Sequence, residues 1–199
     1  MRFTMKIFTS CLSVITLLFI SLSSPALAAK AYFAGGCFWC MESDFEKLEG
    51  VREVISGFTG GTVDMPTYSG NHAGHYETVE VLYDPEEVSY DDLLTHYWHH
   101  IDPFDDSGQF CDKGPSYKTA IFTSTVQEEM LAQTSKQKVA DQFPKQKVVT
   151  QIFTLTKFFP ITGAESYHQD YYKNYPSKYR FYRWRCGRDA RINEIWGDK

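Results

Sequence analysis

The sequence lacks a dense cysteine framework, long blocks of like charge and internal repeats. Five cysteines in 199 residues are too few to build a fold from disulfides. A disordered chain is excluded because aromatic residues make up 16% of the sequence. The chain carries 20 basic and 25 acidic residues, a net charge of −5, so neither nucleic acid nor an anionic membrane is expected as a partner.

Long apolar runs are also missing, apart from one near the start of the chain. Arg2 and Lys6 precede an apolar run over residues 11–20 that is short for a membrane span, and a cleavage-like series of small residues follows it. This pattern predicts a secretory signal peptide over residues 1–28 and one folded domain over residues 29–199. Cleavage would leave 18 basic and 25 acidic residues, in a protein exported to a periplasm or the medium and free of the membrane.

The rest of the sequence alternates between strand and helix patterns. Period-two alternation and short apolar runs predict strands, and apolar residues at helical spacing predict helices. The expected strands cover residues 31–34, 51–61, 75–83, 117–123 and 148–155, and the expected helices begin near residues 37 and 89 and cover residues 125–143 and 164–174. Together these elements predict one α/β domain, a two-layer sandwich with a mixed sheet.

One short segment carries the strongest chemical signal. Gly35 and Gly36 follow the first expected strand and make a tight turn, so Cys37 lies at or near the first turn of a helix. Helix N-termini have free N–H groups and a partial positive charge, which favour the nucleophilic thiolate. Phe38 and Trp39 follow at once and are expected to wall an apolar pocket. The alternative is a structural cysteine pair buried in a core helix.

Loss of the signal peptide would remove Cys11 and leave four cysteines: Cys37, Cys40, Cys111 and Cys186. The first two have the spacing of a dithiol redox centre or of half a zinc site. Zinc needs two further ligands at paired spacing, and no second CxxC motif is present. We interpret His96, His99 and His100 as the polar end of a helix. A thioredoxin-like dithiol stays open, although this pair encloses two aromatic residues.

Glu77 lies on the expected strand over residues 75–83 and shares a face with apolar residues. An ionised carboxylate on an inward face is unfavourable, so the pKa of Glu77 is expected to rise toward the value that a general acid needs. The alternative is an acid paired at a strand edge. Tyr68 and Tyr117 lie in loops beside strand ends, where functional sites tend to occur, and each alone is a weak signal.

Taken together, the motifs resemble those of the peptide methionine sulfoxide reductase A (MsrA) family. They follow the family's order from about residue 31 to residue 182, and the series as a whole is specific. The matching segments are Gly36-Cys37-Phe38-Trp39, Gly57-Phe58-Thr59-Gly60-Gly61, Pro66-Thr67-Tyr68, Gly74-His75 with Glu77, Tyr83-Asp84-Pro85, Asp102-Pro103, Asp112 with Gly114 and Tyr117, and Tyr167-His168-Gln169-Asp170-Tyr171-Tyr172. The resemblance implies the family's fold, with a ferredoxin-like core, over residues 29–199.

The resemblance also implies the activity, which is thiol-dependent reduction of methionine S-sulfoxide, free or in proteins, to methionine. Cys37 would attack the sulfoxide sulfur and Glu77 would protonate the departing oxygen. The other implied site residues are two tyrosines that hydrogen-bond to this oxygen, an aspartate that acts through water, and two aromatic residues around the S-methyl group: Tyr68, Tyr117, Asp112, Phe38 and Trp39. A sulfoxide is a poor electrophile until its oxygen is protonated, so both a nucleophile and an acid are needed.

The resemblance further implies that Cys37 is left as a sulfenic acid, which condenses with a second cysteine to a disulfide. A thioredoxin-like dithiol protein would reduce that disulfide, without metal or organic cofactor. Cys186 is the first candidate for the resolving cysteine, because the family often keeps it on the C-terminal segment and a mobile tail could reach Cys37. Cys40 and Cys111 follow in that order. The implied role of this monomer is the repair of exported proteins under oxidative stress.

Several positions depart from the family pattern. The loop after Tyr68 is shorter than in many members, position 76 is Tyr where a small residue is common, and position 40 is Cys where many members have Gly. The tail around Cys186 lacks the glycine-rich cysteine motif of some members, so the resolving step is the part least transferable from the family. Two alternatives from other classes are a secreted thiol–disulfide exchange protein that uses Cys37 and Cys40, and a binding module with two disulfides.

Overall fold

The computed structural model describes residues 1 and 28–197. The signal peptide predicted over residues 1–28, which includes Cys11, lies outside the described residues except for its two ends. Within the part that is described, no helix is long and apolar enough to cross a membrane. The described chain forms a single α/β domain with a mixed sheet, as the sequence predicts.

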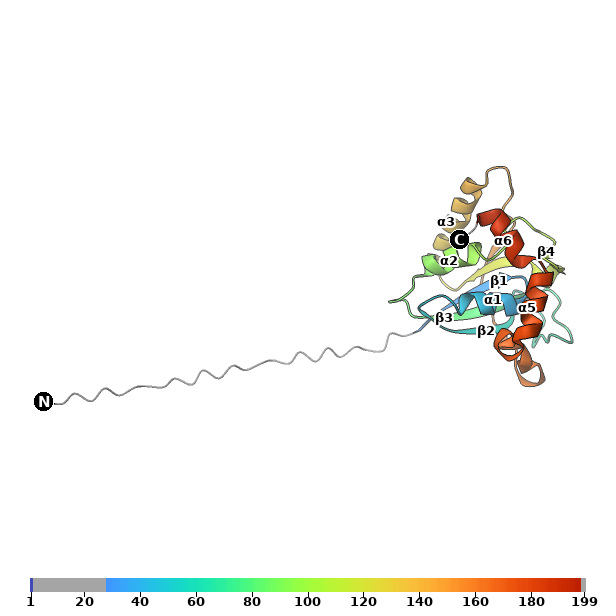
Figure 1. Cartoon of the computed structure of the whole chain (residues 1–199), viewed down its shortest axis with the longest axis horizontal. Coiled ribbons are helices and arrows are strands. Elements are labelled where there is room, and N and C mark those ends of the chain that lie inside the picture. The colour runs from blue at the N-terminus through green and yellow to red at the C-terminus, as the bar shows by residue number, and fades with distance from the viewer. Residues whose placement is uncertain (2–27, 198–199) are drawn as a thin grey trace.

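A six-stranded sheet forms the centre of the fold (Figure 1). Its strands are β1 (Ala29–Gly35), β2 (Val51–Thr59), β3 (Tyr76–Tyr83), β6 (Thr119–Thr123), β7 (Gln151–Thr154) and β8 (Phe159–Pro160). Their order is β7-β6-β1-β3-β2-β8, and only the β6–β7 pair is parallel. The strand β1, which leads into the cysteine-bearing turn, is therefore flanked by strands on both sides. The short strands β4 (Gly108–Gln109) and β5 (Asp112–Lys113) form a separate hairpin.

The side chains of β1 alternate between two packed faces. Ala31 and Phe33 belong to the main core, together with apolar residues of the helices. Tyr32 and Ala34 pack in a second, smaller cluster with Phe122 of β6. A strand that is buried on both faces has a continuous apolar sequence rather than an alternating one, which explains why residues 31–34 are recognisable as a strand.

Three helices in the first two thirds of the chain are close to their predicted positions. They are α1 (Phe38–Phe45), α2 (Tyr90–Trp98) and α3 (Val126–Gln142). The Ser89 hydroxyl accepts the Asp92 N–H at 3.2 Å, and the Asp92 carboxylate accepts the Ser89 N–H at 3.0 Å. This reciprocal cap satisfies backbone donors at the start of α2. The Thr125 hydroxyl accepts the Glu128 N–H in the same way and begins α3.

The C-terminal part differs from the sequence prediction. The helix expected over residues 164–174 is divided into a 3₁₀ helix, η2 (Gly163–His168), and α4 (Tyr171–Asn174), because Asp170 adopts a left-handed φ of 54°. A second 3₁₀ helix, η1 (Pro115–Tyr117), replaces the start of the strand expected from residue 117. No helix was predicted after residue 175, yet the chain forms α5 (Pro176–Arg185) and α6 (Arg188–Trp196).

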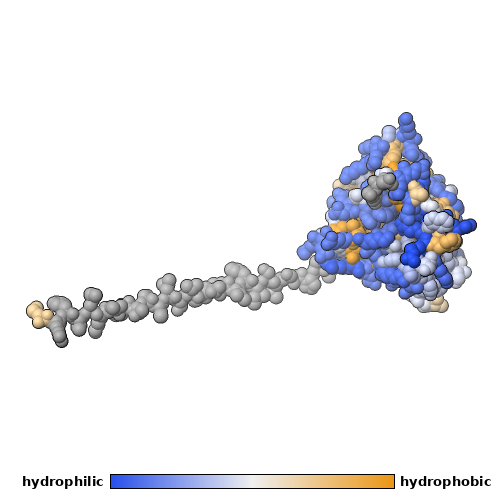
Figure 2. Space-filling view, in the orientation of Figure 1, coloured by the Kyte–Doolittle hydropathy of each residue, from blue (hydrophilic) through white to orange (hydrophobic). Residues whose placement is uncertain are grey.

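These last two helices are packed against the domain rather than free of it. Tyr179 on α5 and Ile192 on α6 are about 95% buried, and Arg188 is 1% exposed. The face shown in Figure 2 is mostly hydrophilic, with small and separate apolar patches. Phe181 and Trp184 of α5 are exposed. The helix α5 therefore has one side buried against the domain and another side in solvent.

Candidate active site

The turn between β1 and α1 places Cys37 at the start of a helix. Cys37 is the N-terminal cap of α1, and Gly36 before it has a φ of 84°, a conformation that glycine adopts readily. A Cβ atom on Gly36 would lie 2.5 Å from Cβ of Gln109, and one on Gly35 would lie 2.3 Å from Sδ of Met41. Both glycines are required because other residues crowd the turn. The predicted helix-start position of Cys37 is confirmed.

Glu77 of β3 approaches the same turn from the sheet. Its side chain is almost fully buried, and its Oε2 accepts the backbone N–H of Phe38 at 3.1 Å. Burial raises the pKa of Glu77 to about 8, and the charge of Asp112 adds to this rise, while the bond from Phe38 opposes it. The inward position and raised pKa predicted for Glu77 are confirmed. At neutral pH the group is mainly a carboxylic acid, which can donate a proton.

The two thiols of α1 form a buried, hydrogen-bonded pair. Cys37 and Cys40 are free cysteines, and both are buried. Burial raises the pKa of Cys37, and its bond to Cys40 and the charge of Glu77 raise it further. The same bond lowers the pKa of Cys40, and the positive charges of Arg188 and Arg183 lower it further against the effect of burial. The sequence placed the thiolate on Cys37, but in the resting structure the negative charge is favoured on Cys40.

The loop tyrosines from the sequence lie near the acid. The Tyr117 hydroxyl hydrogen-bonds to Glu77. The ring of Tyr68 packs against Phe38 with ring centroids 6.0 Å apart. Burial raises the pKa of Tyr68 to about 12, and the charges of Glu77 and Cys37 add to this. Both tyrosines therefore keep their hydroxyl protons at neutral pH and can donate hydrogen bonds.

Asp112 joins the site through a tyrosine that carried no signal in the sequence. The Tyr182 hydroxyl of α5 donates to Oδ2 of Asp112. Burial raises the pKa of Asp112, although this bond lowers it in part. The Tyr182 hydroxyl also acts on Cys37 and lowers the pKa of that thiol against the larger effect of burial. Tyr182 therefore connects the nucleophile to Asp112. It was missed because no helix was predicted in the tail and its tyrosines matched no motif.

Aromatic side chains wall the site on the side of α1. Trp39 stacks on Tyr171 at 3.7 Å between ring centroids, and its indole N–H donates to Nδ1 of His168 at 3.0 Å. His168 lies 4.0 Å from the ring of Tyr68 and is 1% exposed. The sequence predicted the wall from Phe38 and Trp39. Its C-terminal part comes from the His168 and Tyr171 motif, which had no assigned role.

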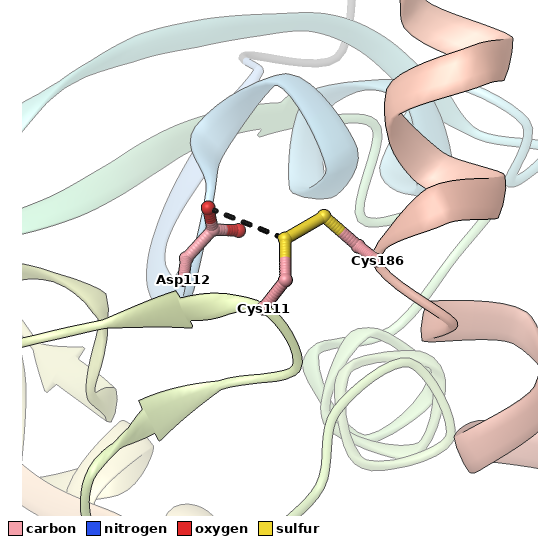
Figure 3. Close-up of side chains that lie close together, drawn as sticks. All are labelled: Cys111, Asp112 and Cys186. Carbon is pink, nitrogen blue, oxygen red and sulfur yellow. Dashed lines mark hydrogen bonds between the residues drawn. A yellow bond between two sulfur atoms is a disulfide. The ribbon is translucent and has the colours of Figure 1, made fainter.

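The other two cysteines are joined in a disulfide beside the site (Figure 3). Cys111 lies next to β5 and Cys186 follows α5, and their Cα atoms are 4.8 Å apart. The Cys111 sulfur lies 3.8 Å from Oδ1 of Asp112; because it is bonded to sulfur and has no proton to donate, this is a contact only. Cys111 is exposed, and the disulfide borders a groove lined also by Tyr182, Trp184 and Arg185.

Two groups of potential metal ligands occur among the described residues, and both are engaged within the protein. The first contains Cys111, Asp112 and Cys186, whose sulfurs are bonded to each other. The second contains Glu42, Glu46 and Asp170. Glu42 accepts the Asp170 N–H at 2.7 Å, and Glu46 pairs with Lys173 and Tyr172.

Comparison with known proteins agrees with this chemistry. Residues 29–199 match the family described as peptide methionine sulfoxide reductase. The peptide methionine sulfoxide reductase MsrA 2 of Caulobacter vibrioides is 43% identical over 204 residues, which cover 99% of this chain and 100% of that protein. The methionine sulfoxide reductase A structure from Corynebacterium diphtheriae has a TM-score of 0.65 and 28% identity, covering 77% of each chain.

A more distant structure shares the fold. It is Mxr1 from Saccharomyces cerevisiae in complex with Trx2, with a TM-score of 0.52 and 17% identity over 74% of this chain and 87% of Mxr1. The family match favours a reductase over a thiol–disulfide exchange protein or a binding module. The match over the whole described domain, together with a buried thiol and a carboxylic acid meeting at one helix start, shows that the chain belongs to the peptide methionine sulfoxide reductase family.

Proposed function

We propose that Cys37 and Glu77 carry out the first step of the methionine sulfoxide reduction that this family performs. The single observation that supports this assignment is their meeting at the start of α1, where Glu77 accepts the N–H of Phe38, the residue after Cys37. The Cys37 thiolate attacks the substrate sulfur while Glu77 protonates the oxygen. The bond between substrate sulfur and oxygen breaks, methionine leaves, and the oxygen remains on Cys37 as a sulfenic acid.

Hydrogen-bond donors surround the place where this oxygen develops charge. Tyr117 bonds to Glu77, and Tyr68 lies within the electrostatic influence of both Glu77 and Cys37. We assign both hydroxyls to the sulfoxide oxygen, where preorganised donors lower the barrier. We assign Asp112, which accepts a hydrogen bond from Tyr182, to the ordering of water beside them. Phe38 and Trp39 form the apolar wall for the S-methyl group.

For the resolving step, Cys40 is the candidate with the most support. It is hydrogen-bonded to Cys37, whereas Cys186, the first candidate from the sequence, is bonded to Cys111 and follows a packed helix. Cys40 attacks the sulfur of the Cys37 sulfenic acid. The Cys37–Cys40 disulfide forms, and the oxygen leaves as water with the proton of Cys40.

The exposed position of the Cys111–Cys186 disulfide supports a role for this pair in passing oxidation from the buried thiols to an external reductant. When Cys111 and Cys186 are reduced thiols, they can exchange with a Cys37–Cys40 disulfide, which restores the buried thiols and leaves the Cys111–Cys186 disulfide. A thioredoxin-like dithiol protein then reduces that bond and is itself oxidised to a disulfide. The Mxr1 complex with Trx2 is consistent with such a reductant. The accessible position of Cys111 supports attack from solvent.

The N-terminal sequence supports a proposal for the cellular role. An apolar run after two basic residues and a small-residue cleavage pattern support export of residues 29–199. We place the enzyme in a periplasm or the medium, as a monomer that repairs oxidised exported proteins without metal or organic cofactor. Fractionation of cells that express the full chain should yield a shortened form outside the cytoplasm. A full-length form retained in the cytoplasm would contradict export.

The resolving step is tested by single turnovers of the Cys40→Ser and Cys186→Ser variants. Each reduced variant receives one equivalent of methionine sulfoxide, and peptide mapping identifies its disulfides. Cys40→Ser should still form one equivalent of methionine and leave a sulfenic acid that a dimedone probe labels. Cys186→Ser should form the Cys37–Cys40 disulfide at the wild-type rate. Failure of that bond to form in Cys186→Ser, with a normal Cys37 disulfide in Cys40→Ser, would return the resolving role to Cys186.

A further inference from the structure

A fully buried arginine lies beneath the turn that carries the thiols. Arg188, the first residue of α6, is 1% exposed. Its guanidinium donates to the carbonyl oxygen of His100 at 2.7 Å and to that of Gly35, the last residue of β1, at 3.3 Å. It also stacks over the ring of Phe110 at 4.5 Å and lies 3.1 Å from Sδ of Met41. Most of these partners are neutral, so they do not balance its charge.

The positive charge of Arg188 is only partly compensated within the described part of the chain. The one carboxylate there within 4 Å is Asp44, at 3.7 Å. Asp44 lies closer to Arg183, at 2.9 Å. Burial alone would raise the pKa of Asp44, but the charges of Arg183, Arg188 and His100 hold it below its ordinary value. Two guanidinium groups therefore share one buried carboxylate, and the second partner of Arg183, Asp189, is in solvent.

A second observation shows the same lack of compensation. The Nε atom of Arg188 is buried and has no hydrogen-bond partner. A buried cation that lacks a full set of partners is unfavourable, and buried charges are as a rule paired with a charge of opposite sign. Cys40 is the group in a position to supply that charge, because it precedes Asp44 by one turn of α1 and feels both arginines.

The groups that act on Cys40 come from four elements. Cys37 caps α1 and Asp44 lies on that helix, while Glu77 lies on β3. Tyr179, Tyr182 and Arg183 lie on α5, and Arg188 lies on α6. Glu77 is neutral below its pKa of about 8, and burial raises the pKa of both tyrosines far above neutrality. At neutral pH the charged groups that act on Cys40 are therefore Asp44 and two arginines, and the other partner of Arg183, Asp189, lies in solvent.

We propose that Arg188 is a positioning residue that holds a thiolate at Cys40, so that Cys40 can take the proton of Cys37 when the sulfoxide binds. The proton moves from Sγ of Cys37 to Sγ of Cys40, and the resulting Cys37 thiolate attacks the substrate. Cys40 then carries the proton that leaves with the sulfenic oxygen as water when the disulfide forms. This inference rests on the proposed roles of Cys37 and Cys40 and assigns the source of the negative charge that both steps need.

The test is a direct titration of Cys40 in the full chain. Cys11→Ser and Cys37→Ser are combined and the Cys111–Cys186 disulfide is kept oxidised, so Cys40 is the only free thiol. Its thiolate is followed by ultraviolet absorbance against pH. Arg188→Met should raise the pKa of Cys40 by about one unit, so the midpoint of the thiolate absorbance should move to higher pH by that amount. Arg188→Lys should restore most of the thiolate. Arg191→Met, on the same helix but paired with Asp102, should leave the titration unchanged.

A variant that removes a negative charge instead of a positive one separates this electrostatic role from simple packing. Asp44→Asn removes the competing negative charge, so the Cys40 thiolate should persist to lower pH than in the parent. A packing role predicts lower stability in both Arg188→Met and Asp44→Asn without opposite shifts of the titration. If Arg188→Met does not fold, the direction of the pKa shift of Cys40 in Asp44→Asn still tests the electrostatic role. An unchanged Cys40 titration in the folded variants would overturn the proposal.

Activity measurements distinguish this inference from the resolving role itself. With Cys37 present, Arg188→Met should form the first methionine more slowly at neutral pH, by at most about tenfold for a one-unit shift, and the deficit should shrink as the pH rises. A rate deficit that does not depend on pH would overturn proton transfer to Cys40. If the titration and the rate shift as expected but peptide mapping shows Cys37 bonded to Cys186, the assignment of Arg188 stands and only the resolving role of Cys40 fails.

Discussion

The two cysteine pairs of this protein occupy contrasting environments. Cys37 and Cys40 are buried as free thiols at the start of a helix, next to a carboxylic acid and two arginines. Cys111 and Cys186 are bonded to each other at the surface, beside exposed Trp184. The buried pair has the charge control that chemistry on a sulfoxide needs, and the outer pair has the access that a protein reductant needs. Burial, more than sequence spacing, separates the two roles.

The largest effect should come from the buried pair. Cys37→Ser removes the sulfur nucleophile, and a hydroxyl cannot form the sulfenic acid, so even a single turnover should be abolished. The measurement is the methionine formed from one equivalent of sulfoxide by the reduced variant. The Cys111→Ser variant is the matched control because its first turnover uses the same buried thiols. Conversion of one equivalent by Cys37→Ser would show that the nucleophile lies elsewhere.

The next effect concerns the acid beside this pair. Glu77→Gln keeps the shape of the side chain but cannot give up a proton, so the reductase step should slow by ~10²–10⁴-fold. Because the pKa of Glu77 is about 8 and only the protonated form is an acid, the wild-type rate should fall as the pH rises above about 8. Single-turnover rates between neutral and alkaline pH measure both effects.

The alkaline fall should be missing in the Gln variant. A loss smaller than about tenfold with the fold intact would move the acid role to Asp112 or water. Circular dichroism of the variant gives the necessary check on folding, since Glu77 also accepts the N–H of Phe38.

The outer pair should affect stability and turnover but not the first chemical step. Replacing both Cys111 and Cys186 with Ser opens a bond between residues 75 positions apart, which should lower the free energy of unfolding by ~2–4 kcal/mol. Methionine formation in a single turnover should stay close to wild type, while turnover with a dithiol protein should fall. Denaturant unfolding and the two kinetic assays test this division. Loss of the first turnover in a folded double variant would show that the outer pair takes part in the first chemical step.

The smallest effect should come from the residue that links the two pairs. Tyr182→Phe removes the donor to Asp112, which leaves a partly buried carboxyl short of one hydrogen bond and should destabilise the fold by ~1–3 kcal/mol. The first turnover should slow less than in Glu77→Gln. Tyr90→Phe is a matched control, because the buried hydroxyl of Tyr90 has no partner and its removal should be neutral or stabilising. Equal losses of stability in Tyr182→Phe and Tyr90→Phe would argue against a specific role for the hydrogen bond from Tyr182 to Asp112.

Much of the fold was predictable because local signals agreed with packing. The strand over residues 31–34 is apolar on both faces, and Ser89 and Thr125 mark helix starts with capping chemistry. The C-terminal helices were not predictable. The helix α5 has a mostly polar and aromatic sequence without a clean apolar face, and it is held by contacts such as that of Tyr182 with Asp112. Such a helix is determined by partners distant in the sequence.

The sequence by itself determined the chemistry of the catalytic turn. Gly35 and Gly36 after an apolar strand dictate a tight turn, and this puts Cys37 at a helix start whatever the rest of the fold does. Period-two alternation likewise put Glu77 on an inward face, and burial of a carboxyl raises its pKa. These features depend on short-range geometry and on one physical effect, so a single sequence is enough to predict them.

Only the tertiary structure decided how the four thiols are divided. The pairing of Cys111 with Cys186 depends on α5 packing beside the β4–β5 hairpin, a contact between segments far apart in the chain. The favoured site of the thiolate also depends on distant residues, because Arg188 arrives from α6 and adds its charge beside Cys40 rather than Cys37. Electrostatic energies depend on distance in space and on burial, and neither is written in the spacing of residues along the chain.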